Sequence, residues 1–167
     1  MEDEQVTEWF AQVGTSPGMG GIASQLHGPA VRVVSVGPLF DVVVVAADLG
    51  QEACSLLKAA GDLGPVVGTE LGRLSFLIAP HGGDRWRELT ADSGLAAIAQ
   101  ARYLSTGTYL WLPTPSPPPP PWEPVAWWVE HPQMVGSTVR LTDGAHLCAA
   151  IGVAVHTLAA SAVPGNG

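Results

Sequence analysis

Histidines are the first residues to consider for acid–base or metal chemistry, and their spacing decides whether they can act together. The five histidines are His27, His81, His131, His146 and His156. No two of them are four residues apart, the spacing that presents two imidazoles to one metal from a single helix face. We interpret them as isolated side chains, and single out His81 because it follows a predicted strand and precedes two glycines, where a side chain can reach a cleft.

Carboxylates on strands are the second source of chemistry. Metal-dependent phosphoryl transfer commonly uses two acids at alternate strand positions, because such side chains share one face and one cation. In the run FDVVVVAAD the residue two positions after Asp41 is Val43, so this pair is missing. Asp48, at the end of the run, is placed to cap the following helix through its carboxylate.

Other catalytic motifs are also missing. The glycine-rich segment GTSPGMGG lacks the GK[ST] ending of a P-loop, and no predicted strand precedes it. Ser75 and Ser105 stand outside any Gly-x-Ser-x-Gly elbow and have no identifiable base. Cys54 and Cys148 fall at apolar positions of predicted helices, where a thiol acts as a small hydrophobe. The sequence therefore predicts no metal and no cofactor, and it demands no particular reaction.

The charge balance argues against nucleic acid as the main partner. The 167 residues include 15 acidic and 7 basic side chains, for a formal net charge of −8. A nucleic-acid-binding protein normally shows the reverse, because Lys and Arg contacts with phosphates supply most of its affinity. We expect the arginines near the middle of the chain to be scattered, solvated side chains.

The chain is more apolar than an average soluble domain. Hydrophobic residues make up 47% and charged residues 13% of it, against an average charged fraction of about 25%. Some of this apolar surface is expected to meet a partner protein or a second copy. The acidic start MEDEQVTEW differs from a secretory signal, and no apolar run approaches the roughly 20 residues that span a bilayer. We therefore expect a cytoplasmic protein without membrane contact.

The stretch 40–80 is the unit to which the other elements are added. The run Phe40–Val45 is apolar at odd and even positions alike, which predicts a central strand buried on both faces. A helix follows from Asp48 and closes at Gly61, where a left-handed residue is favoured. Two further strands joined through Gly72 predict an antiparallel hairpin.

Weaker patterns flank this unit. Residues 3–13 carry apolar side chains at i, i+3, i+4 and i+7, which predicts an amphipathic helix. Residues 103–112 predict two strand pieces joined, or one strand bent, at Gly107. The proline-rich run 113–124 cannot be a helix or a central strand, so it predicts a stiff surface loop. Asp143 begins the last helix, whose apolar stripe should pack on the sheet.

These elements predict a single domain of the α+β class, with a mixed or mostly antiparallel sheet and packed helices. Residues 1–29 supply the N-terminal helix and the Gly-rich loop, and residues 30–112 form the α/β core. Residues 113–124 form the Pro-rich loop, and residues 125–160 a strand and the C-terminal helix.

Several of these segments together resemble a known family. The quoted features are the F-D-x-x-x-V-x-A entry to the first core strand, the LGPV start of the hairpin, the strand end FLIAP and the strand YLWLP. A tryptophan strand, VAWWVEHP, and a closing helix follow. Over roughly residues 40–160 this succession is similar to the primase-polymerase-like domains of actinomycetes described as bifunctional DNA primase/polymerase.

The resemblance implies an RRM-like core of the archaeo-eukaryotic primase kind. Active members of that superfamily bind divalent metals through a strand Asp-x-Asp and a further acid, and a histidine helps to hold the nucleotide. In this chain the first motif retains only Asp41, His81 departs from the histidine motif, and the zinc-binding cysteines found near the amino end of some members are absent. The resemblance therefore implies a degenerate, non-catalytic relative.

We expect the protein to be an accessory or regulatory interaction module, whose partner is another protein or a second copy. The predicted strand 125–130 places Trp127 and Trp128 on opposite faces, so at least one indole should be exposed or in an interface. The candidate interaction surface consists of the tryptophans around the proline-rich loop, Trp111, Trp122, Trp127 and Trp128.

Two alternatives remain open at this stage. The first is residual binding of nucleotide or DNA, or a related activity, using Asp41, Arg73 and His81 on the primase-like sheet. The second is a small-molecule enzyme or binding protein that reuses the fold, since unrelated functions share folds.

Overall fold

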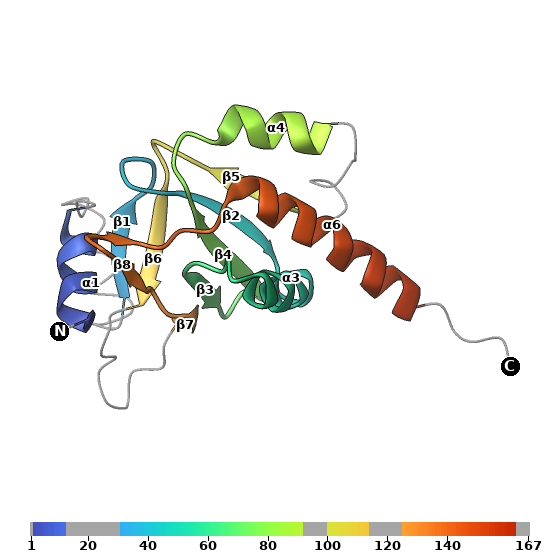
Figure 1. Cartoon of the computed structure of the whole chain (residues 1–167), viewed down its shortest axis with the longest axis horizontal. Helices are drawn as coiled ribbons and strands as arrows, with labels where there is room; N and C mark the ends of the chain where they lie inside the picture. Colours follow the sequence, from blue (N-terminus) through green and yellow to red (C-terminus); the bar gives the residue numbers. More distant parts are fainter. Residues whose placement is uncertain (1, 13–30, 92–99, 114–124, 163–167) are drawn as a thin grey trace, which may run out of the picture.

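The computed structural model describes residues 2–12, 31–91, 100–113 and 125–162. Within these ranges the chain forms one α+β domain, which confirms the predicted fold class (Figure 1). The Gly-rich loop, almost all of the proline-rich loop and Trp122 lie outside the described residues.

A five-stranded antiparallel sheet forms the centre of the domain. Its strands, in spatial order, are β5 (Arg102–Leu104), β2 (Asp41–Ala46), β4 (Arg73–Ile78), β3 (Val66–Thr69) and β7 (Ala126–Glu130). Each neighbouring pair is antiparallel. The valine-rich strand β2 is paired on both sides, as its two-sided apolar pattern predicts, but β4 and not β2 occupies the middle position.

Local signals account for the connections around β2. The helix α3 (Ala47–Ala60) follows β2 directly and ends at Gly61, whose φ of 73° confirms the predicted left-handed cap. The hairpin from β3 to β4 turns at Gly72, with a φ of 68°. Along the chain, α4 (Gly83–Ala91) then leads to β5, so the order of elements is β2-α3-β3-β4-α4-β5.

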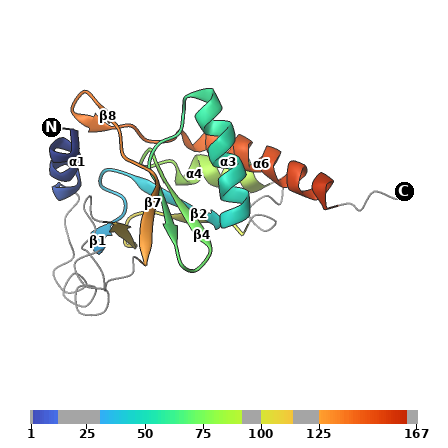
Figure 2. The same cartoon turned by 90° about the horizontal axis from the view of Figure 1, so that it is seen from below.

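Three helices cover one face of the sheet. They are α3, α4 and α6 (Gly144–Ser161); α6 packs against both α3 and α4, and the layer packs against β2 and β4 (Figures 1 and 2). Val43, Phe76 and Ile78 point from the strands into this layer, and Leu147 and Ile151 meet them from α6. We call this side of the sheet the helix face.

The opposite face is covered by the N-terminal helix, by a second, smaller sheet and by a short hairpin. Here β1 (Val31–Ser35) pairs with β6 (Tyr109–Pro113), and α1 (Glu2–Ala11) packs beside the short hairpin of β8 (Met134–Val135) and β9 (Thr138–Val139). The buried side chains of this second cluster come from both the five-stranded sheet and its cover. The sheet is therefore buried on both faces.

Two details differ from the sequence-based predictions. The segment 103–112 does form two strands joined around Gly107, whose φ is 92°, but β5 and β6 belong to different sheets, so the turn carries the chain from one layer to the other. The hairpin of β8 and β9 was not predicted, because each of its strands has only two residues.

Of the two aspartates predicted to be helix N-caps, one is not a cap and the other is confirmed as one. Helix α3 begins at Ala47 with Ala46 as its N-cap, and no side chain caps it, so Asp48 lies inside the first turn. Asp143 is the N-cap of α6, and its carboxylate accepts hydrogen bonds from the backbone N–H groups of Ala145 and His146.

Helix α6 corrects the expectation about apolar runs. Among the described residues it is the one helix long and apolar enough to cross a membrane by length and composition, with a mean hydropathy of 1.4 over 18 residues, 28% of them buried. Leu147 and Ile151 are fully buried against the helix face, which is also the behaviour of a core helix. Beyond Ala154 its residues are half-buried or exposed, and this end projects past the sheet (Figures 1 and 2).

Candidate functional site

Asp41 is a buried carboxylate at the beginning of β2. Its side chain shares the helix face with Val43 and is only 2% exposed. Its Oδ2 atom accepts a hydrogen bond from the backbone N–H of His81 at 2.9 Å and a second one from the hydroxyl of Tyr103. Asp41 therefore joins the beginning of β2 to the turn after β4 and to the edge strand β5.

His81 contributes its backbone to this cluster and not its imidazole. The residue has a φ of 66°, in the left-handed region that few residues other than glycine adopt, and its side chain is exposed. The hydrogen bond from its N–H to Asp41 holds the turn in this conformation. The following glycines leave room for Tyr103, because a Cβ atom on Gly83 would lie 3.2 Å from its ring.

Tyr103 is the member of the cluster that sequence reasoning missed. It lies opposite Val43 in the antiparallel pairing of β5 with β2, so it shares the face of Asp41. Burial, followed by the hydrogen bond to Asp41, raises the pKa of its hydroxyl above its usual value. The phenol therefore keeps its proton at neutral pH and remains a hydrogen-bond donor. The signal available in the sequence was the alternation in Arg102-Tyr103-Leu104, but it does not say which strand β5 joins.

Arg73 lies away from Asp41 and His81. It begins β4, while Asp41 pairs with Ile78 at the other end of that strand. Five residue steps of about 3.3 Å separate these ends, or roughly 17 Å. The guanidinium donates to Oε1 of Gln100 at 3.0 Å. The structure therefore brings together two of the three candidate nucleotide-binding residues and leaves the third at the opposite end of β4.

The described residues contain no assembled site for metal or thiol chemistry. No group of three or more His, Cys, Asp or Glu side chains among those residues could hold a metal ion. Burial, with a smaller effect of nearby Glu130, raises the pKa of the Cys54 thiol to about 11, and burial also raises the pKa of Cys148. Both cysteines are therefore protonated at neutral pH and act as core side chains.

The tryptophans of β7 occupy opposite faces of the sheet, as predicted. Trp127 lies on the helix face and remains 43% exposed. Val129, two residues further along β7, is 39% exposed, and it lies at a β-bulge where the pairing with β3 shifts by one residue. The indole of Trp127 covers Gly68 of the neighbouring strand, where a Cβ atom would lie 2.7 Å from Nε1. One side of the ring therefore rests on backbone. Trp127 and Val129 are the two exposed large apolar side chains of this edge strand, and we call the two together the β7 strip.

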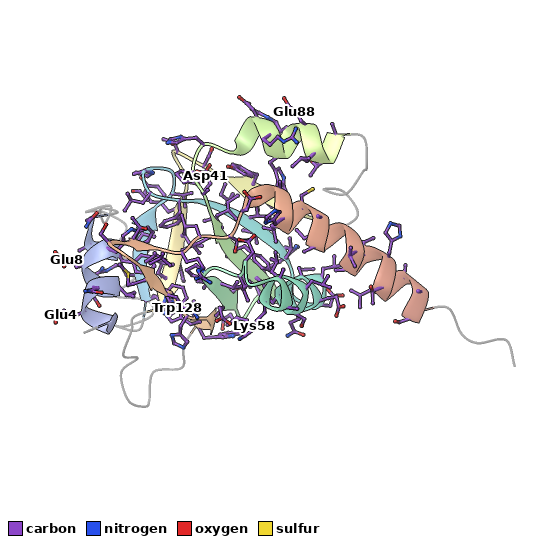
Figure 3. All side chains as sticks on the ribbon, viewed as in Figure 1. Glu4, Glu8, Asp41, Lys58, Glu88 and Trp128 are labelled. Atoms are coloured by element: carbon purple, nitrogen blue, oxygen red, sulfur yellow. The ribbon has the colours of Figure 1, made fainter. Side chains whose placement is uncertain are left out.

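Trp128 points to the other face, beneath α1. Its ring lies 5.8 Å from that of Phe10 and 6.4 Å from that of His131. Trp111, on β6, is half-buried against the same cluster. Figure 3 shows Asp41 towards the α4 side of the molecule and Trp128 well away from it. The Asp41 cluster and the tryptophan surface are therefore separate features.

Charge on β7 is neutralised within the chain. Lys58, the single lysine, approaches Glu130 at 2.9 Å from the end of α3. The hydrogen bond to Glu130 and the attraction of its charge raise the pKa of Lys58. The carboxylate of Glu130, on the same strand as the exposed Trp127 and Val129, is therefore paired within the chain.

The chain matches no protein-family model, and it shows no significant similarity to curated proteins or to solved structures.

Proposed function

We propose that this protein is a non-catalytic interaction module that binds another protein or a second copy of itself. The observation that carries the proposal is the β7 strip, because Trp127 holds nearly half of its surface in solvent on the outermost strand of the sheet. Tryptophan is among the residues most enriched at the energetic centres of protein interfaces. A fixed, exposed indole on an edge strand has the composition of such a centre.

The position of Asp41 supports a non-catalytic role. A carboxylate that binds a catalytic metal needs free lone pairs and neighbouring ligands. Asp41 is buried, and its Oδ2 accepts from the turn at His81 and from Tyr103. Its neighbour at the second motif position is Val43. This is the environment of a structural acceptor.

Mutation of the β7 strip tests the proposal. Trp127→Ala should weaken self-association in sedimentation velocity, or recovery of a defined partner in quantitative pull-down, by at least tenfold. Val153→Ala is the matched control, since Val153 is a 50% exposed apolar residue on α6. If both variants behave like the wild type in both assays, the β7 strip is not an interface and the proposal fails.

We further propose that the scaffold is a degenerate primase-polymerase-like, RRM-like core. The order β2-α3-β3-β4-α4-β5 along the chain, with β5-β2-β4-β3 in space, supports it. This is the succession of a split βαβ unit, the arrangement expected for such a core. Strand β7 extends the unit at one edge, and the smaller sheet covers the face opposite the helices.

Nucleotide binding is the second candidate function, because Asp41 and His81 do meet at one end of the sheet. A thermal-shift titration with a nucleoside triphosphate and Mg²⁺ or Mn²⁺ distinguishes it from the interaction role. A ligand at 100 times its dissociation constant stabilises by about 2.7 kcal/mol. A flat titration over the millimolar range would remove this candidate and leave the interaction module.

A further inference from the structure

We infer that the surface beneath α1 is a docking site for an amphipathic helix of a partner protein, and that α1 occupies this site in cis as a tethered substitute. The inference rests on the proposed interaction function and adds a second surface and the kind of partner that it takes. It starts from the one helix that the structure shows seated there.

Helix α1 is held by three apolar side chains. Val6, Trp9 and Phe10 stand at i, i+3 and i+4, and all three are buried. The remaining described side chains of the helix are exposed, and Figure 3 shows Glu4 and Glu8 at the outer side of α1. This is the anchor pattern by which a single amphipathic helix is recognised.

The surface under the anchors is aromatic. Trp9 stacks on Phe40 at 5.9 Å with an interplanar angle of 27°, and Phe10 meets Phe40 at 6.5 Å and Trp128 at 5.8 Å. Met134 and Val139 of the β8–β9 hairpin belong to the same cluster. We call Phe40, Trp128, Met134 and Val139 the α1 seat. It combines four apolar side chains from three separate segments, so it is formed by the rest of the fold.

The sheets of the fold are complete without α1. All of the strand pairings join β1 to β6, the five central strands, or β8 to β9, and α1 contributes to none of them. The helix has 10 residues. Isolated helices shorter than about 12–15 residues are marginal in water, so α1 depends on the seat for its structure. It can therefore leave and unfold while the sheets stay intact.

Covalent attachment favours α1 in its seat, whereas net charge favours a partner helix. Residues 13–30 join α1 to the rest of the chain, so a released α1 stays covalently attached, and a partner helix must bind the seat more tightly than α1 does. Helix α1 carries four acidic and no basic residues, half of the net −8, so the rest of the chain is also negative. The remainder therefore repels α1 at long range, through its net charge alone. A partner helix with the same anchors and a neutral or basic outer face would bind better.

A labelled peptide tests the seat in the full-length protein. The probe is the sequence MEDEQVTEWFAQ, residues 1–12, and a second probe carries Glu4→Lys and Glu8→Lys. The protein variant Trp9→Ala/Phe10→Ala removes the two aromatic anchors in cis. We expect this variant to bind the first probe at least tenfold more tightly than the wild type does, measured by fluorescence anisotropy, and the Lys probe more tightly still.

Two further protein variants distinguish binding of the peptide at the α1 seat from binding to apolar surface exposed elsewhere. Glu4→Gln/Glu8→Gln in the protein keeps the anchors and should bind the probe as weakly as the wild type does. Adding Trp128→Ala to the anchor variant should abolish the gain. A folded anchor variant, judged by circular dichroism and a cooperative thermal transition, that gains no affinity for either probe would overturn the inference.

Hydrogen exchange in the wild type covers the case in which the anchor variant does not fold. The amides of α1 should exchange at least 100-fold faster than those of β2 and β4, because α1 opens without unfolding the sheets. Equal protection of α1 and β4 would make α1 a permanent part of the core and refute the inference. If Trp127→Ala associates like the wild type while the anchor variant binds the peptide as expected, only the proposed role of the β7 strip is refuted.

Discussion

The hydroxyl of Tyr103 donates a hydrogen bond to Oδ2 of Asp41, which lies 62 positions earlier in the chain. The same oxygen accepts from the N–H of His81. One buried carboxylate therefore fixes the edge strand β5 and the left-handed turn after β4. A residue that the sequence offers as the remnant of a metal site is used as a structural acceptor.

Tyr103→Phe should destabilise the fold by about 1–2 kcal/mol, because it removes a donor from the buried side chain of Asp41. Urea denaturation measures the change in the free energy of unfolding. Tyr109→Phe is the matched control, since Tyr109 is 46% exposed on β6, and it should change that free energy by less than about 0.5 kcal/mol. Equal effects of the two substitutions would show that Asp41 does not depend on the Tyr103 hydroxyl.

His146 should titrate above its usual range. Its Nδ1 atom lies 2.7 Å from Oδ2 of Asp62, and this hydrogen bond, the charge of Asp62 and the charge of Asp143 raise its pKa. Asp62→Asn should lower the pKa of His146 in a titration followed by NMR, with the chemical shifts of His156 as an internal control. An unchanged pKa would mean that the pair does not form in solution.

The same pair gives a pH dependence of stability with a defined sign. Because the folded pKa of His146 is raised above 6.5, its contribution is fully present below that pH and is lost as pH rises through the folded value. The stability difference between the wild type and Asp62→Asn should therefore shrink from roughly pH 5.5 to roughly pH 9. Urea denaturation at the two pH values checks it, and a difference that grows with pH would contradict the sign.

Two helical glycines should respond oppositely to the same substitution. A Cβ atom on Gly50 of α3 would lie 2.7–3.0 Å from three side-chain atoms of Leu74, whereas one on Gly152 of α6 would meet nothing within 4 Å. Gly50→Ala should cost about 1 kcal/mol, since overpacking exceeds the gain in helix propensity. Gly152→Ala should stabilise by about 0.5–1 kcal/mol. Thermal melts of the two variants test the pair, and shifts of the same sign would refute the packing of α3 on β4.

The local parts of the fold were predictable because neighbouring residues determine them. The two-sided apolar run of β2, the left-handed cap at Gly61 and the opposite faces of Trp127 and Trp128 each follow from a few adjacent residues, and the structure confirms them. The middle position of β4 and the separation of β5 from β6 depend on pairings between distant strands. Those pairings are set by packing of the whole chain, which periodicity does not encode.

The Asp41 cluster shows the same limit for the candidate site. The sequence points to Asp41 and His81 separately, but the atom of His81 that matters is its backbone N–H, and a residue type gives no information about that. Tyr103 enters through the pairing of β5 with β2. Arg73 is close to Asp41 only if the direction of β4 is ignored, because the antiparallel register places it at the other end.

The two aspartates at helix beginnings give the last test, since the sequence treats them alike and the structure does not. Asp143 caps α6 by accepting from two backbone N–H groups, so Asp143→Ala should cost about 1 kcal/mol. Asp48 lies within the first turn of α3 and bonds only the adjacent N–H of Leu49 among the described contacts, at 2.8 Å. Asp48→Ala should cost less than about 0.5 kcal/mol, the share of the helix dipole alone. Urea denaturation decides between them, and a larger loss for Asp48→Ala would mean that α3 begins later than Ala47.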